Sequence, residues 1–157
     1  MQALDELNLR ILEILQHDAS ISNQVLSERV FTSAATTLRR VRALEQSGVI
    51  EGTVAILSPE KLCSSITALA EITLDMQNAE SFDAFDALIS AEPAVMQAYR
   101  TAPSVDFTLV LTVRDMAAYH ALVQRLFTAA DNVRNVRSRF VTKRSKFSVA
   151  LPLPSAR

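Results

Sequence analysis

Residues 33–52 read SAATTLRRVRALEQSGVIEG, and this stretch contains both glycines of the 157-residue chain, Gly48 and Gly52. It predicts an amphipathic helix that begins at Ser33, a residue type that accepts a hydrogen bond from an unpaired N–H of the first turn. The helix is expected to end at Gly48, where glycine adopts a left-handed backbone at little cost. The stretch therefore has a defined start and a defined stop.

Apolar and basic residues occupy different sides of this helix. Leu38, Val41 and Leu44 recur at three-residue spacing and predict its buried stripe. At about 100° per residue, Arg39 points away from that stripe, and two further arginines flank it. No acidic residue precedes Glu45 in the helix. Either this surface binds an anionic partner or the arginines keep a solvated helix soluble.

Two further helical patterns precede Ser33. Residues 4–15 carry a wide apolar face, and residues 23–30 form a second, shorter pattern with Ser20 and Ser22 as candidate caps. Two helices joined only by residues 31–33 predict a helix-turn-helix, whose second helix enters the major groove of DNA. The residues then predicted to contact DNA are Ser33, Ala35, Thr36, Arg39, Arg40 and Arg42.

The second half of the chain alternates strand and helix patterns after a proline break at Pro59. Apolar residues at every second position predict a strand over 66–76 that is covered on one face. The remaining pattern predicts a helix over 82–89, strands over 95–101 and 105–113, a helix over 115–127 and a strand over 136–141. This βαββαβ order predicts an α+β fold, a ferredoxin-like sandwich with helices on one face of an antiparallel sheet.

Composition limits the classes of protein to consider. The chain is 49% hydrophobic with net charge −1, charged or polar residues interrupt every apolar run, and the N-terminus has Asp5 where a signal peptide would be basic. We therefore expect a soluble cytoplasmic protein with no membrane partner. The single Cys63 forms neither an internal disulfide nor a multi-cysteine metal site, and it is expected to be a small core residue. We expect no cofactor and no metal.

A second basic strip begins after Asn132 and contains no acidic residue. It is either functional or a solvated strand edge that deters aggregation. Its members are Arg134, Arg137, Arg139, Lys143, Arg144, Lys146 and Arg157.

In combination these patterns resemble the Lrp/AsnC feast-or-famine regulators of bacteria and archaea. The resembling segments are residues 4–12, 21–30 and 39–52, which keep their order and spacing, and the βαββαβ half. The resemblance implies a winged-type helix-turn-helix domain over 1–52, a hinge strand and linker over 53–62 and a dimerising, effector-binding RAM domain over 63–157. It implies a homodimer, often assembled into octamers, that regulates transcription from palindromic operators. An amino acid or other small metabolite bound at the dimer interface is the expected effector.

Two positions depart from the family pattern. Where the family has glycine in the turn between the helices, this chain has Phe31, which on the same backbone path has positive φ at a cost of about 1 kcal/mol; otherwise the turn is rebuilt. In the family's Gly-Asp-x-Asp-Tyr effector loop, residues 103–107 read PSVDF. Asp106 is the candidate acceptor for a ligand ammonium and Ser104 a candidate donor. Alternatively, Asp106 caps the loop or pairs with Arg100.

Three effector mechanisms therefore stay open: a different effector, a ligand that enters from another side, or DNA binding with no effector. Two other functions compete. A sensor that has lost DNA binding is one. The other is an enzyme similar to the sirohaem decarboxylases, which share the two-domain build but use a histidine near the loop, where this chain has none. Here His17 and His120 are expected to be surface residues, and no other catalytic motif is present. We therefore expect a regulator rather than an enzyme.

Overall fold

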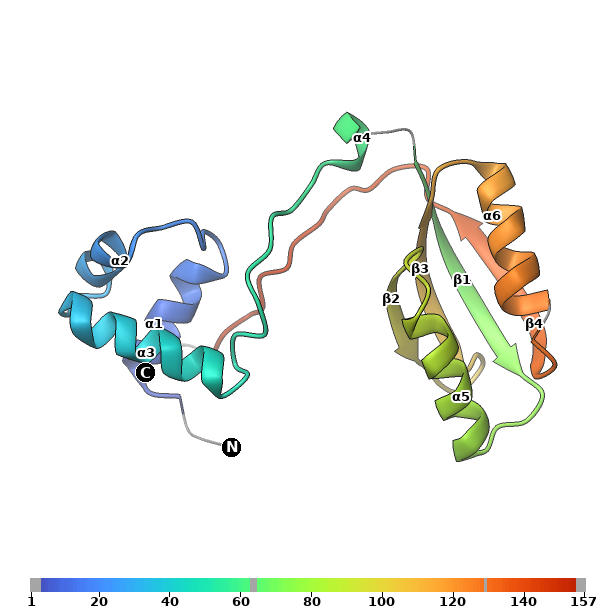
Figure 1. Cartoon of the computed structure of the whole chain (residues 1–157), viewed down its shortest axis with the longest axis horizontal. Helices are drawn as coiled ribbons and strands as arrows, with labels where there is room; N and C mark the ends of the chain where they lie inside the picture. Colours follow the sequence, from blue (N-terminus) through green and yellow to red (C-terminus); the bar gives the residue numbers. More distant parts are fainter. Residues whose placement is uncertain (1–3, 63–64, 129, 155–157) are drawn as a thin grey trace. The chain divides into compact units, whose positions relative to one another are not determined.

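The computed structural model of the chain describes residues 4–62, 65–128 and 130–154. These residues form two compact units (Figure 1), which are treated separately. Unit 1 contains the described residues up to Ile56 and from Lys146 onward, and unit 2 is Leu57–Ser145. Cys63, predicted to be a core residue, and Arg157, a member of the second basic strip, lie outside the described residues.

Unit 1 is built from three short helices, α1 (Glu6–Leu15), α2 (Asn23–Arg29) and α3 (Ala34–Gln46). Each helix begins at a residue whose side-chain oxygen accepts a backbone N–H three residues later: Asp5, Ser22 and Ser33. Such caps satisfy donors that the helix itself leaves unpaired. The helices share a small core made of Ile11, Leu26, Val30 and Leu44. The predicted helix-turn-helix is confirmed.

The turn after α2 is a Schellman motif, in which two backbone bonds close the helix end. The N–H of Phe31 donates to the carbonyl of Glu28 at 3.3 Å, and the N–H of Thr32 donates to that of Ser27 at 3.0 Å. This geometry places Phe31 at φ 57°. The turn therefore keeps the left-handed path with its strain and is not rebuilt. This was one of the two outcomes expected from the sequence.

The turn after α3 has the same construction. The N–H of Gly48 donates to the carbonyl of Glu45 at 3.0 Å, and the N–H of Val49 donates to that of Leu44 at 3.0 Å. Gly48 has φ 73°, so the prediction that this glycine ends the helix is confirmed. The two turns share this pair of backbone hydrogen bonds and differ in the residue at the left-handed position.

Unit 2 has the predicted βαββαβ order. Its elements are α4 (Pro59–Leu62), β1 (Ile66–Leu74), α5 (Ala79–Ser90), β2 (Val95–Arg100), β3 (Phe107–Val113), α6 (Met116–Val123), a π-helical turn (Gln124–Thr128) and β4 (Val133–Phe140). The sheet is antiparallel with the order β2-β3-β1-β4. Helices α5 and α6 cover one of its faces (Figure 1). Residues 53–58, expected to contain a hinge strand, form no strand in this structure. The helix α4 was not predicted, because four residues are too few for a helical pattern.

The covered face holds the core of unit 2. Alternate residues of β1 and β3 are buried there, including Ala70, Ile72 and Leu109. The ring of Phe85 lies 4.7 Å from that of Phe107, centroid to centroid. We call the other face of the sheet the open face, which is only partly covered within this chain. The two faces differ because successive side chains of a strand point to opposite sides of the sheet.

The C-terminal residues return to unit 1. The N–H of Leu151 donates to Oε1 of Gln16, in the turn after α1, at 2.9 Å. Two stretches of chain thus connect the units, one around residues 56–57 and one around 145–146. The sequence prediction placed the residues after 146 in the second domain. Among the described helices, none combines the length and the apolar character needed to cross a membrane.

Candidate DNA-binding surface and effector loop

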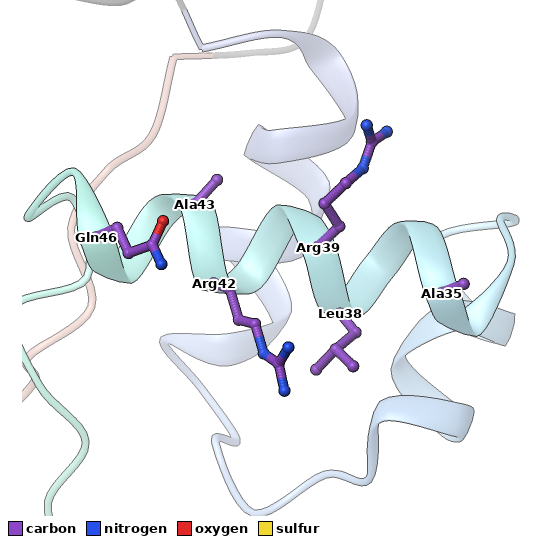
Figure 2. Close-up of a pocket in the computed structure, with 6 residues that line it drawn as sticks. All are labelled: Ala35, Leu38, Arg39, Arg42, Ala43 and Gln46. Atoms are coloured by element: carbon purple, nitrogen blue, oxygen red, sulfur yellow. The ribbon is translucent and has the colours of Figure 1, made fainter.

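The outer face of α3 forms a shallow groove on the side away from the core of unit 1. Figure 2 shows its lining and the side chains of Arg39 and Arg42, which leave the helix in different directions. The groove is lined by Ala35, Leu38, Arg39, Arg42, Ala43 and Gln46. Neither Arg39 nor Arg42 forms an ion pair within the described part of the chain. Two cations on a face opposite the core make this surface suitable for an anionic partner.

The buried stripe of α3 differs from the predicted one. Thr37 is fully buried, whereas Leu38 is 40% exposed and lies in the groove. The Thr37 hydroxyl donates to the carbonyl of Ser33 at 3.1 Å, which satisfies its polar group inside the core. The stripe is therefore Thr37, Val41 and Leu44, and the placement of Leu38 in it was wrong. Hydropathy alone favoured leucine over threonine, although spacings of four and three suit a helix equally well.

Arg40 projects toward α1 and not into the groove. Its guanidinium pairs with the carboxylate of Asp5 and lies 3.4 Å from Oδ1 of Asn8. The N–H of Asn8 and, after it, the Arg40 guanidinium hold the pKa of Asp5 below its usual value. The pair joins the start of α1 to the middle of α3, so the structure gives Arg40 an intramolecular partner.

The start of α3 carries two of the predicted residues. The hydroxyl of Ser33 accepts the N–H of Thr36 at 3.2 Å and donates to the hydroxyl of Thr36 at 2.9 Å. Both side chains are thus used to hold the first turn. Of the six predicted DNA contacts, Ala35, Arg39 and Arg42 share the groove. Leu38, Ala43 and Gln46 also line the groove but were not among the predicted contacts, although the helical period places them on this face once Thr37 is taken as buried.

Asp106 anchors the loop between β2 and β3 from the inside. Its Oδ2 accepts the N–H of Leu74 at 2.7 Å and the side-chain N–H of Gln77 at 3.1 Å, and its backbone N–H donates to Ile72. The residue is buried, whereas Ser104 is exposed. Its carboxylate therefore holds the loop to the end of β1, which agrees with the capping alternative.

Arg100 does not pair with Asp106. Its guanidinium binds the carboxylates of Asp83, at 2.7 Å, and Asp86 on α5. It also lies 5.2 Å from the ring centroid of Phe82, within the range of a cation–π contact. The predicted alternative of an Arg100–Asp106 pair is therefore wrong, because α5 supplies two acidic partners on the helix side of the sheet.

Comparisons with known proteins agree with both units. Residues 4–51 match the winged helix-turn-helix DNA-binding model, and residues 67–151 match the Lrp/AsnC ligand binding domain. The leucine-responsive regulatory protein of Rhizobium meliloti is 35% identical over 91% of this chain and 92% of its own length. The crystal structure of an AsnC family transcriptional regulator from Agrobacterium tumefaciens superposes with a TM-score of 0.88, at 32% identity, over 95% of this chain and 97% of that one. A transcriptional regulator from Neisseria meningitidis, crystallised in complex with L-Met, gives a TM-score of 0.87 at 29% identity, over 96% and 97% of the two chains.

The chain belongs to the Lrp/AsnC family. It is a DNA-binding transcriptional regulator with a helix-turn-helix unit and an α+β ligand-binding unit. The resemblance stated from the sequence is thus confirmed.

Within this Lrp/AsnC fold, part of the second basic strip is neutralised. Arg134 pairs with Asp75 at 2.7 Å, and Arg139 makes two hydrogen bonds to Glu71 on the neighbouring strand β1. Exposed pairs of this kind contribute little to stability, but they neutralise two of the three arginines of β4. For these two residues the strand-edge interpretation fits better than a functional one.

The histidines of this Lrp/AsnC chain are at the surface, as predicted. His17 and His120 are both exposed, and His17 lies 3.4 Å from the carboxylate of Glu13. Within the described ranges, no group of three or more histidine, cysteine or acidic residues is arranged to hold a metal ion.

Proposed function

We propose that this Lrp/AsnC regulator binds palindromic operators as a homodimer, with α3 of each copy in the major groove. The observation that carries the proposal is the groove on α3, where Arg39 and Arg42 lie opposite the buried residues Thr37 and Leu44. A dimer presents two such helices to half-sites about one helical turn apart. The regulator acts in the cytoplasm, where its DNA target lies, and it has no catalytic role.

Each groove residue suits a different part of DNA. Arg39 is proposed to read guanine through its two terminal nitrogens, and Arg42 to bind phosphate or a neighbouring base. Leu38 and Ala35 offer apolar surface to a thymine methyl group. Ser33 and Thr36 hold the first turn of α3, and the proposal gives the N-terminus of this helix, with its free N–H groups, a contact to phosphate.

For Arg40 we propose a positioning role in place of the predicted phosphate contact. Its ion pair with Asp5 joins α1 to α3 and leaves the guanidinium less available to DNA. Arg39 then holds the reading position and Arg42 the flanking one.

Dimerisation is proposed to use the open face of the sheet in unit 2. Leu69 and Tyr99 are exposed on this face, and Val110, the partner of Leu69 across the β1–β3 ladder, is half-buried. A sheet covered by helices on one side only gains stability when a second copy covers the other. Larger assemblies, such as octamers, would be built from these dimers.

An amino acid or related small metabolite is the proposed effector, bound near the loop between β2 and β3. Two relatives support this class: one is named leucine-responsive, and another was crystallised with L-Met. Ser104 is exposed for donation to a ligand, and Asp106 keeps its second carboxylate oxygen for an ammonium while holding the loop. A thermal-shift screen of the amino acids tests this, because a ligand at 100 times its Kd stabilises the folded state by about 2.7 kcal/mol.

The DNA proposal is tested with duplexes selected from a random pool by the wild-type chain. Arg39→Ala is expected to weaken binding to the selected duplex by about 1–3 kcal/mol per half-site. Arg114→Ala, which removes an exposed arginine of unit 2 paired only with Asp115, is the matched control and should bind like wild type. Equal affinity of Arg39→Ala and wild type would remove Arg39 from the reading face.

A further inference from the structure

Phe31 is a residue of unit 1 to which the proposed function gives no role. Its side chain is 88% exposed, and among the described residues it is the one non-glycine with positive φ, 57°. Glycine or asparagine adopts this conformation with less strain. An exposed ring also gains nothing from burial within its own chain. Strain that persists at such a position points to a functional use of the side chain.

The surrounding turn holds the ring in its outward position. Val30, just before it, is buried in the core of unit 1. The N–H groups of Phe31 and Thr32 are both bonded to carbonyls of α2. The backbone is thus fixed on both sides of the α-carbon, so only the side-chain torsions of the ring remain to be ordered when a partner arrives.

The position of Phe31 identifies that partner. It lies two residues before Ser33, the cap of α3, and the next exposed side chains along the chain are Ser33 and Ala35, the latter in the groove. In a helix-turn-helix, the N-terminal residues of the second helix contact the base edges. Phe31 therefore lies at the end of α3 that approaches DNA. A phenyl ring donates no hydrogen bond, and the apolar group that the major groove offers it is the C5-methyl of thymine.

We propose that Phe31 contacts a thymine methyl group at the edge of each half-site and so adds to the base selection of α3. The inference rests on the proposed DNA binding. It assigns a specificity role to the turn, in addition to the groove of α3, and it accounts for a strained aromatic residue where a glycine would satisfy the backbone.

The test compares full-length Phe31→Ala, Phe31→Leu and wild type on two duplexes. One is the duplex selected by wild type from a random pool, and the other is the same duplex with every thymine replaced by uracil, which lacks the methyl group. Phe31→Ala should bind the thymine duplex at least about fivefold more weakly than wild type, whereas Phe31→Leu retains most of the affinity. On the uracil duplex, wild type and Phe31→Ala should bind alike. Met116→Ala, which truncates an exposed apolar residue of α6, should match wild type on both.

The outcomes separate this inference from the proposal beneath it. Failure of wild type to select any duplex would contradict the proposed DNA binding itself. Selection by wild type with undiminished binding of Phe31→Ala would sink only the role of Phe31. An equal loss on both duplexes, or selected half-sites without thymine, would exclude the methyl contact. A lower assembly mass of Phe31→Ala in light scattering, with unchanged affinity for DNA, would show that the ring contacts a second copy of the chain instead.

Discussion

Helices α2 and α3 end in the same pair of backbone bonds, yet the left-handed position holds Phe31 after one helix and Gly48 after the other. A Cβ built at Gly48 would have no neighbour within 4 Å. Packing therefore does not demand glycine at the end of α3, and backbone strain alone favours it. After α2, the chain accepts that strain and presents an aromatic ring to solvent. The difference shows that the turn after α3 has the residue that its backbone favours. The turn after α2 keeps an aromatic side chain that its backbone does not favour.

Gly48→Phe has the largest expected effect on stability among these variants. It makes the turn after α3 resemble the turn after α2. The substitution places a bulky residue at φ 73° and should lower the free energy of unfolding by about 1–2 kcal/mol. Loss of a flexible glycine from the unfolded chain offsets part of this. Urea unfolding of the full chain measures the effect. The midpoint should fall, and the slope of the free energy of unfolding against urea concentration should stay unchanged. An unaltered midpoint would mean that a left-handed residue carries no strain in this turn, which would remove the argument made for Phe31.

The opposite change at the first turn, Phe31→Gly, should stabilise the protein. Relief of the left-handed strain is expected to raise the free energy of unfolding by up to about 1 kcal/mol and the Tm of unit 1 by a few degrees, roughly 4 °C. The matched control is Phe31→Ala, which removes the ring but keeps a Cβ at positive φ, and its Tm should stay near that of wild type. Calorimetry measures both.

Phe31→Gly should at the same time weaken DNA binding as much as Phe31→Ala does. A variant that is more stable but binds less tightly is the signature of strain retained for function. A parallel fall in stability and affinity would indicate that the ring supports the fold of unit 1.

Much of the fold could be predicted because its patterns are local. Caps at Ser22 and Ser33, the stop at Gly48 and the alternation along β1 each fix an element within a few residues of sequence. The left-handed φ of Phe31 was one of two outcomes that the family resemblance left open, the other being a rebuilt turn, and the structure shows the first.

The site was harder to predict because its details depend on contacts between elements. The partner of Arg40 lies 35 positions earlier, at Asp5. The bond of the Thr37 hydroxyl to Ser33 lies within one helix, but the burial of Thr37 against the other helices was not visible in its hydropathy. Asp106 was a candidate for a ligand ammonium or for a loop cap, and the sequence did not reveal that its carboxylate holds the end of β1 at Leu74, 32 positions away. Sequence spacing reports which residues share a face, but it does not report which polar group a side chain finds across the fold.

Breaking the ion pair between Asp5 and Arg40 has the smallest expected effect on stability. It tests the contact between α1 and α3 while the turns at the helix ends stay unchanged. Asp5→Asn keeps an oxygen for the N–H of Asn8 but removes the charge that faces Arg40. Both side chains are partly exposed, 47% for Asp5 and 32% for Arg40, so the loss at pH 7 should be about 0.2–1 kcal/mol and should shrink in high salt.

The pH dependence of this loss has a definite sign. The pKa of Asp5 is lowered in the folded state, chiefly by the N–H of Asn8 and then by Arg40. Its contribution to stability is therefore complete above the unfolded pKa of about 4 and disappears as the pH falls through the lower folded value. Urea unfolding of wild type and Asp5→Asn should differ at pH 7 and converge below pH 4. A difference that persists at a pH low enough to protonate Asp5 in the folded protein as well would mean that the asparagine disturbs the cap of α1 rather than the charge pair. Arg40→Ala, which leaves the cap intact, would then show no such persistence.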